Sequence, residues 1–318
     1  MLTRVERNHA TTLTHTFYVG ETPTDPTGTP TYAVVDANGT SVTSGNATVV
    51  GASSGQVTAA LAAQSALKAL TITWVAIVGG VSRTEVDYAE VVGGFYFGLA
   101  EGRGSDAALA NTTTYPTSAV ELRRLETEVE CDYICDRAFV PRYRRLVLDG
   151  SGTTELVLAD ADLRTIRRIA VADRLDETFT DLGSAALAAV AIGTDRTIRR
   201  TDGNVFTEGR RNVIVEYEFG LDAPPPDLVW ATKTRLRTRL TMPTSAIPDR
   251  AQSFVVAEGG TFRLTMPGAF ATGIPEVDAV YGRYSLREGV GGDGGRPVPA
   301  SRTLDYTPQR WSMFHGAR

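Results

Sequence analysis

The density of charged residues changes sharply near residue 117 of this chain. Residues 1–117 contain 5 basic and 9 acidic residues, whereas residues 118–318 contain 27 and 28. The first segment is instead rich in threonine, alanine, glycine and valine, and short alternating runs dominate it. A chain of 318 residues is long enough for about two domains. The sequence therefore predicts two domains of different kinds.

The first hundred residues resemble a series of short strands separated by turns. Leu13–Gly20 alternates apolar and polar residues, and Asn38-Gly39 and Gly79-Gly80 fit tight hairpin turns. Residues 62–70 are either one short helix or a crossing loop. Further strands are expected at 31–35, from 40 onward, and at 47–50, 56–61, 71–78 and 81–92. About seven strands at this spacing predict a small antiparallel sandwich over residues 1–104.

The glycine-rich and polar stretch that follows predicts a linker at 105–117, after which helical spacing begins. Ser118 and Glu121 form a capping-box pattern, and the helix is expected to end near Asp136. Its apolar residues at helical spacing are Leu122, Leu125, Val129 and Tyr133.

Strand-like runs and two further helices make up the rest. Strands are expected at 144–148, 155–158, 164–171 and 213–219. A helix should start at Pro225-Pro226, where missing amide donors cost nothing, and another at Pro275. The apolar stripe of the first of these helices is Leu228, Thr232, Leu236 and Leu240. Residues 289–318 are glycine-rich at first and predict a flexible C-terminal arm.

Signals for catalysis are weak, so we expect no enzymatic activity. The three histidines, His9, His15 and His315, lie near the two ends, and a catalytic site would have to assemble from those ends. We expect His15 to be a packed or edge histidine. Cys131 and Cys135 could offer two thiolates on one helix, but no second Cys or His pair completes a zinc site. Structural thiols are the favoured interpretation, with no metal and no cofactor.

Neither a membrane segment nor a secretory signal is expected. Apolar runs such as 74–78 are much shorter than the roughly 18 residues of a membrane span, and residues 1–12 are polar. The net charge of −5 argues against a protein that coats nucleic acid nonspecifically.

Charged residues of opposite sign gather on two of the expected helices. Four bases lie within 233–239, and acids crowd the helix that begins near residue 118. They could form solvated faces, or the acidic helix of one copy could face the basic helix of the next around a ring. Of the 32 Lys and Arg residues only Lys68 and Lys233 are lysine, which either reflects codon usage or the suitability of the arginine fork for interfaces.

Five segments of the charged part, in this order and spacing, resemble the head-to-tail adaptor (connector) proteins of siphophages, the tailed phages with long noncontractile tails, especially those infecting actinobacteria. The resemblance covers residues 118–288 and rests on structural rather than catalytic motifs. The segments are 135–142 (CDRAFVPR), 148–152 (LDGSG), 212–220 (NVIVEYEFG), 224–228 (PPPDL) and 272–280 (TGIPEVDAV).

The resemblance implies a multidomain protein in which a mainly α (α+β) connector domain, a helix bundle with a β excursion, spans 118–288. It implies a virion structural protein at the head–tail junction, assembled in the host cytoplasm. Twelve copies would form the neck ring that joins the portal ring to a tail-side connector or tail terminator protein, and double-stranded DNA would pass through without sequence-specific binding. Contacts between subunits are assigned to Glu126, Glu130, Lys233, Arg235 and Arg239, and docking on the portal to Trp311, Met313 and Phe314.

The N-terminal sandwich departs from the plain family pattern, because a typical adaptor starts near the first helix. Residues 32–40 and Trp74 resemble the immunoglobulin-like modules that phages attach to virion proteins. We expect it to decorate the outside of the neck. The alternative function is a tail or baseplate adhesin whose sandwich binds host surface glycans.

Overall fold

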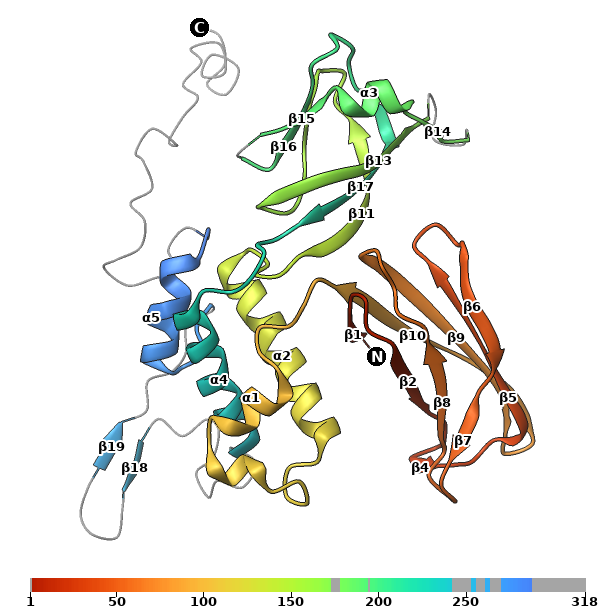
Figure 1. The fold of residues 1–318 in the computed structure, drawn as a ribbon, viewed down its shortest axis with the longest axis vertical. Helices are drawn as coiled ribbons and strands as arrows, with labels where there is room; N and C mark the ends of the chain where they lie inside the picture. Colours follow the sequence, from red (N-terminus) through yellow and green to blue (C-terminus); the bar gives the residue numbers. More distant parts are fainter. Residues whose placement is uncertain are drawn as a thin grey trace, which may run out of the picture. The chain divides into compact units, whose positions relative to one another are not determined.

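The computed structural model describes residues 2–172, 178–193, 195–241, 253–255, 261–263 and 270–287 (Figure 1). The chain forms two compact units, and each unit takes two separate segments of the sequence. Unit 1 combines Met1–Gly98 with Arg137–Pro225, and unit 2 combines Leu99–Asp136 with Pro226–Arg318. The predicted domains 1–104, 105–117, 118–288 and 289–318 are each continuous in the sequence, whereas each unit of the structure combines two separate segments.

The N-terminal part of unit 1 is a β-sandwich, as the sequence predicted. One sheet has the order β1-β10-β9-β5-β6 and the other β2-β8-β7, while β3 and β4 form a small hairpin. The strands are β1 (Leu2–Glu6), β2 (Thr11–Thr16), β3 (Tyr18–Val19), β4 (Thr22–Pro23), β5 (Thr27–Asp36), β6 (Ser41–Asn46), β7 (Thr48–Val50), β8 (Gln56–Leu61), β9 (Lys68–Val78) and β10 (Val81–Val92). Residues 62–67 are a crossing loop rather than a helix. Strand β1, which the sequence analysis missed, pairs in parallel with β10.

Strict alternation in the central strand β9 builds the sandwich core. Its inward side chains, Leu70, Ile72, Trp74, Ala76 and Val78, are all buried. Its outward positions carry alanine, threonine, valine and isoleucine. The period of two therefore sets both the register and the buried face of this sheet.

The second part of unit 1 is also built of strands. One antiparallel sheet has the order β11-β17-β13-β14, and a smaller one has the order β12-β16-β15. The elements are β11 (Arg142–Gly150), β12 (Glu155–Val157), β13 (Leu163–Val171), β14 (Thr180–Asp181), α3 (Ser184–Ala188), β15 (Val190–Ile192), β16 (Thr197–Arg200) and β17 (Gly209–Phe219). Both sheets contribute to one core, in which Leu156, Ile198 and Phe206 pack with Val213, Val215 and Tyr217.

A mainly α connector domain over 118–288 is therefore not confirmed. The region between residues 142 and 219 is mostly strand, because alternating β-branched and aromatic residues recur in β11, β13 and β17. The predicted β excursion is a β domain with its own core.

Unit 2 contains the helices. They are α1 (Leu99–Gly104), a 3₁₀ turn η1 (Ala107–Ala110), α2 (Thr117–Cys135), α4 (Pro226–Thr241) and α5 (Pro275–Tyr284), with a β18 (Ser253–Val255) and β19 (Thr261–Arg263) hairpin. Helices α4 and α5 begin at prolines, as predicted, and Asp136 ends α2 in the left-handed conformation with φ 54°. The predicted capping box at Ser118 is wrong: α2 starts one residue earlier, so Ser118 lies inside its first turn and Pro116 is the cap.

The two β parts of unit 1 are joined by close packing of the chain after β10 against the chain before β11. The Gly93 amide donates to the carbonyl oxygen of Pro141 at 2.7 Å, and the amide of Phe139 donates to the Tyr96 hydroxyl at 3.3 Å. Glu90 accepts two hydrogen bonds from the Arg142 guanidinium, at 2.8 and 2.5 Å. This junction leaves no room for a side chain at residue 93.

We predict that Gly93→Ala destabilises the protein by about 1–3 kcal/mol, because a Cβ at residue 93 would lie 2.7 Å from three ring atoms of Pro141. Urea unfolding of the full chain measures the loss. Gly94→Ala is the matched control, since a Cβ there meets nothing within 4 Å. Equal stability of the two variants would contradict the packing described.

Candidate interaction surfaces of the helical unit

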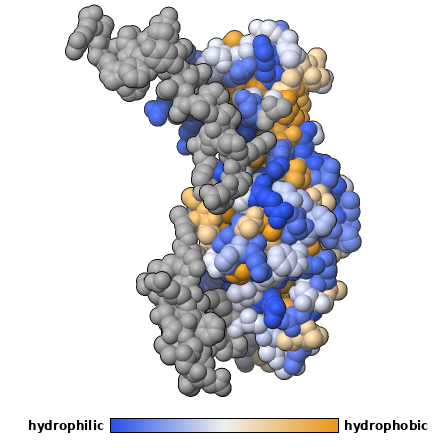
Figure 2. All heavy atoms as spheres, turned by 90° about the vertical axis from the view of Figure 1, so that its left-hand side faces the viewer, coloured by the Kyte–Doolittle hydropathy of each residue, from blue (hydrophilic) through white to orange (hydrophobic). Residues whose placement is uncertain are grey.

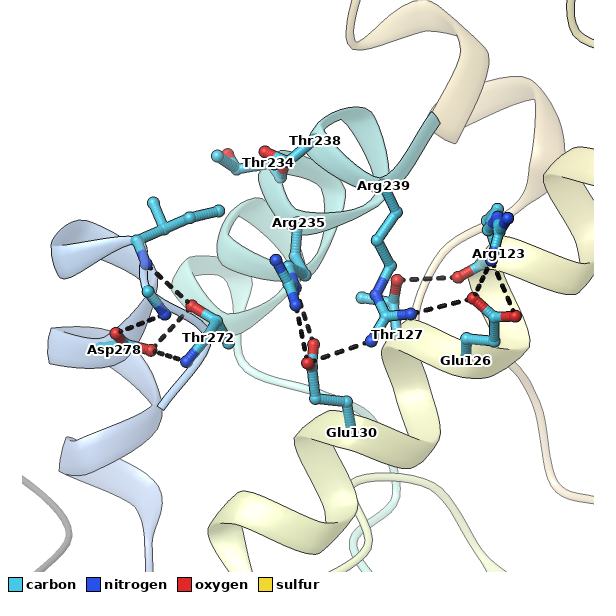
Figure 3. A network of polar contacts seen from close by, with 12 residues as sticks. Arg123, Glu126, Thr127, Glu130, Thr234, Arg235, Thr238, Arg239, Thr272 and Asp278 are labelled. Carbon is cyan, nitrogen blue, oxygen red and sulfur yellow. Dashed lines mark hydrogen bonds and ion pairs between the residues drawn. The ribbon is translucent and has the colours of Figure 1, made fainter. Parts of the chain in front are cut away.

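A network of ion pairs joins α2 to α4 (Figure 3). Arg235 donates from Nε and Nη2 to the two carboxylate oxygens of Glu130, both at 2.8 Å. Arg239 donates to Glu126 at 2.9 Å and lies 3.0 Å from Glu130. Arg123 also binds Glu126, at 2.7 Å. Acids spaced by four residues on α2 thus meet bases spaced by four on α4, which is the spacing of side chains on one helix face.

Partial burial shapes the electrostatics of this network. Burial of the Glu130 carboxyl would by itself raise its pKa, but the hydrogen bonds and charges of Arg235 and Arg239 outweigh burial and lower the pKa. At Arg235, burial acts in the opposite direction and is again outweighed, so its pKa is raised. Both groups therefore stay charged, and each depends on its partner.

These are four of the five residues that the sequence analysis assigned to contacts between subunits. The structure brings Glu126, Glu130, Arg235 and Arg239 together within one chain. The fifth, Lys233, binds Glu101 of α1 at 2.8 Å instead. Their participation in contacts between copies stays a prediction, whereas their structural role inside the chain is established by these bonds.

Helix α5 closes the unit over the C-terminal half of α2. The Cys135 thiol donates to the carbonyl oxygen of Tyr281 at 3.6 Å, and the Leu286 amide donates to the carbonyl oxygen of Cys135 at 2.9 Å. Asp278 accepts from the amide and hydroxyl of Thr272, both at 2.7 Å, which holds the turn before α5. The helical unit is thus fastened by polar contacts at both ends of α5.

Both cysteines are buried at the contact of α2 with α5. Their sulfur atoms are 4.0 Å apart, and burial raises the pKa of the Cys131 thiol well above its ordinary value. Among the described residues, no three His, Cys, Asp or Glu side chains gather in a way that could hold a metal ion. The burial of both thiols in this contact fits the interpretation as structural cysteines.

His15 of the sandwich packs flat against Trp74, with ring centroids 5.6 Å apart. Its two ring nitrogens lie 2.7 Å from Asp87 and 3.0 Å from Glu85. Asp87 also accepts from the Trp74 indole at 3.1 Å. The expectation of a packed histidine is confirmed, but its pairing with two carboxylates was missed, because these partners lie 72 and 70 residues away in the sequence.

Contacts of the β domain were also missed by the sequence analysis. Tyr143 donates to the buried carboxylate of Glu216 at 2.8 Å, and Arg168 binds the same carboxylate at 2.9 Å. The signal in the sequence was the alternation Glu216-Tyr217-Glu218 in β17, which pairs in antiparallel register with both β11 and β13. Without that register, the partners could not be assigned.

The proposed portal-docking residues, Trp311, Met313 and Phe314, lie outside the described residues, as does the arm at 289–318. None of the helices within the described ranges is long and apolar enough to cross a membrane. On the face drawn in Figure 2, hydrophilic and hydrophobic residues alternate in small areas.

Comparison with known proteins finds distant structural similarity. No family model matches the chain, and no curated protein matches it. Among solved structures, a chain from the neck of an empty gene transfer agent (GTA) particle, computed with C6 symmetry, is 14% identical with a TM-score of 0.42 over 62% of this chain and 93% of that one. A chain from the virion of a native GTA particle is 16% identical with a TM-score of 0.41, over 62% and 93%.

CopC from Methylosinus trichosporium OB3b is 12% identical with a TM-score of 0.22, covering 28% of this chain and 81% of CopC. Sequence identities and TM-scores this low do not support an assignment of function.

We predict that Glu130→Gln lowers the free energy of unfolding at neutral pH by about 1–2 kcal/mol, since it removes the charge that pairs with Arg235 and Arg239. The pKa of Glu130 is lower in the folded chain than its ordinary value of 4.5, so its contribution is complete above that value and is lost as the pH falls through the folded pKa. The difference between variant and wild type should therefore shrink between about pH 6 and about pH 3.

Urea unfolding at each pH measures this difference. Glu121→Gln, at an exposed position of the same helix, is the control and should match wild type throughout. A difference for Glu130→Gln that stays constant with pH would show that the charge of Glu130 is not what stabilises the helix pair.

We also predict that neither cysteine reacts with a thiol reagent such as Ellman's reagent in native buffer, because both are buried and the pKa of Cys131 is raised. Both should react once guanidinium unfolds the chain. Ser118→Cys adds a thiol at an exposed position of α2 and should react at once in the native state. Rapid reaction of the unaltered chain would place a cysteine at the surface.

Proposed function

We propose that the chain is a structural protein of a phage-like particle, positioned at the neck, where it forms a ring between the portal of the head and the tail. It acts by binding other proteins and carries out no covalent chemistry, with neither metal nor cofactor. A siphophage infecting an actinobacterium is the proposed source, with assembly in the host cytoplasm before incorporation into the virion. The ring would have twelve copies and allow double-stranded DNA to pass.

The observation that carries this proposal is how the adaptor-like segments of the sequence meet in the fold. The Gly150 amide, in segment 148–152, donates to the side chain of Asn212, which begins segment 212–220, at 2.8 Å. A Cβ on Gly220, at the end of that segment, would collide with the carbonyl oxygen of Val140 in segment 135–142. Segments far apart in the sequence are therefore direct neighbours.

The remaining two segments lead into α4 and α5, which pack together in unit 2. Asp227 of segment 224–228 accepts a hydrogen bond from Tyr284 at 2.8 Å, just after segment 272–280. That segment forms the turn and the first helical residues of α5, held by Thr272 and Asp278. The pattern that resembles the adaptors thus consists of structural junctions, which supports a protein whose task is to hold a shape in an assembly.

The sandwich fits a decoration role on the outside of the neck. We propose that it is an immunoglobulin-like module, supported by its two packed sheets and buried central Trp74. It has few charges, so its contacts would depend on shape and on uncharged groups.

Particles produced without this chain test the proposed function. We expect DNA-filled heads that leak DNA and fail to join tails, visible by electron microscopy, and expect the wild-type chain supplied in trans to restore joined particles. Normal yields of joined, DNA-filled particles without the chain would refute the proposal.

A second candidate, a tail or baseplate adhesin, is favoured by one feature of the sandwich. The outward side chains include no charged residue from Thr71 to Ile77 in β9 or from Ser82 to Tyr88 in β10. Of these side chains, Ile77, Val86 and Tyr88 are between 44% and 56% exposed. Exposed apolar surface of this kind marks interaction sites. Val86→Asp separates the two functions: loss of adsorption by fully assembled particles supports adhesion, whereas normal adsorption argues against it.

A further inference from the structure

His15 lies between two carboxylates of the opposite sheet of the sandwich. Strand β2, which carries His15, belongs to the smaller sheet, and β10, which carries Glu85 and Asp87, belongs to the larger one. The His15 Nδ1 atom is 2.7 Å from an oxygen of Asp87, and the Nε2 atom is 3.0 Å from an oxygen of Glu85. The ring therefore joins the two sheets through both of its nitrogens.

An imidazole ring can make both of these contacts as hydrogen bonds in one protonation state. An ionised carboxylate only accepts hydrogen bonds, so each ring nitrogen must carry a proton to bind one. Neutral imidazole has one N–H group and one lone pair, whereas imidazolium has two N–H groups. The geometry around His15 is therefore that of a cationic ring with a carboxylate on each side.

The plane of the His15 ring is fixed by its aromatic neighbours. The ring stacks on the Trp74 indole with an angle of 19° between the planes, and it meets the Phe17 ring edge-on at a centroid distance of 4.6 Å. Only 10% of the His15 side chain is exposed. A ring packed in this way cannot turn freely, so the loss of a proton acts on the carboxylates beside it.

The two carboxylates are held differently. Asp87 also accepts from the Trp74 indole at 3.1 Å, and its side chain is 17% exposed. Burial by itself would raise the pKa of Asp87, but the hydrogen bonds and charges of the amino terminus and of His15 outweigh burial and lower the pKa. The Glu85 side chain is 35% exposed, and within the described residues it accepts a hydrogen bond from His15 alone.

The other strands around the ring carry few charges. Strand β8, which pairs with β2, has no charged residue, and β9 has only Lys68, its first residue. In β10, Arg83 precedes Glu85 on the same side of the strand and donates to the carbonyl oxygen of Tyr18 at 2.7 Å. The proton on Nε2 of His15 is therefore what binds Glu85 to the smaller sheet.

We propose that His15, Glu85 and Asp87 form a pH-sensitive switch between the two sheets of the sandwich. Under acidic conditions the ring donates to both carboxylates. Near neutral pH, where histidine side chains exchange their second proton, Nε2 gives its proton to solvent. Nδ1 keeps its proton, because its bond to Asp87 is the shorter and more buried of the two. Glu85 then faces a lone pair and turns toward water. The switch does not depend on the proposed neck function.

Nitrogen-15 NMR of the histidine rings in the full-length chain tests the switch, because the chemical shifts of the ring nitrogens show which of them carries a proton. His9→Gln and His315→Gln each remove one set of signals and thereby assign the third set to His15. We expect protons on both His15 nitrogens at pH 5. At pH 8.5 the ratio of Nδ1–H to Nε2–H forms should be at least about fivefold higher for His15 than for the exposed His9.

Three results of this experiment would overturn the proposal. A His15 ring with a single proton at pH 5 would mean that it does not donate to both carboxylates. A proton that remains on Nε2 at pH 8.5 would mean that Glu85, not Asp87, holds the neutral ring. Equal ratios for His15 and His9 would mean that neither carboxylate selects the nitrogen that keeps the proton.

The release of Glu85 is tested by crystal structures of the full-length chain at pH 5 and pH 8.5. The Glu85 carboxylate should lie within hydrogen-bonding distance of Nε2 at pH 5 and away from it at pH 8.5, while Asp87 stays on Nδ1. Glu85→Gln is the matched control, because an amide can accept from Nε2–H or donate to the bare nitrogen and should stay in place at both pH values. A Glu85 side chain that keeps its position at pH 8.5 would overturn the proposal.

Discussion

The helical unit depends on the ion pairs between α2 and α4. A partly buried carboxylate such as Glu130 is stable only with its partners present, and Arg235 supplies a two-point hydrogen bond that a lysine could not. These bonds hold one flank of α2 against α4. The neighbouring side chains Val129 and Tyr133 remain exposed.

The same use of arginine recurs through the charged part of the chain. Arg137 binds Asp162 and Arg142 binds Glu90 through two parallel hydrogen bonds, in the geometry of the Arg235 pair. Each of these pairs joins segments distant in sequence. The scarcity of lysine, with 30 arginines among 32 basic residues, therefore has a structural use in this protein, whatever its genetic origin.

The β domain that lies between α2 and α4 in the sequence is held by close backbone approaches as well as by charges. Glycine is required at residue 220, where φ is 97° and the carbonyl oxygen of Val140 occupies the place of a side chain. Gly93 meets Pro141 in a similar way on the side of the sandwich. The chain thus passes between its β parts through junctions that tolerate no added atoms.

Local patterns in the sequence determined most strands of the sandwich, the prolines that begin α4 and α5, and the end of α2 near Asp136, because these depend on periodicity and on the conformation of single residues. They could not reveal that β1 joins β10, that residues 142–219 build a core of their own, or that the acids of α2 and the bases of α4 bond within one chain. Those features depend on which distant segments become neighbours. The bonding of Glu130 to α4 and the exposure of Tyr133 likewise follow from the partners of α2 in the fold, since a helix with charged and apolar residues on several sides can be buried on any of them.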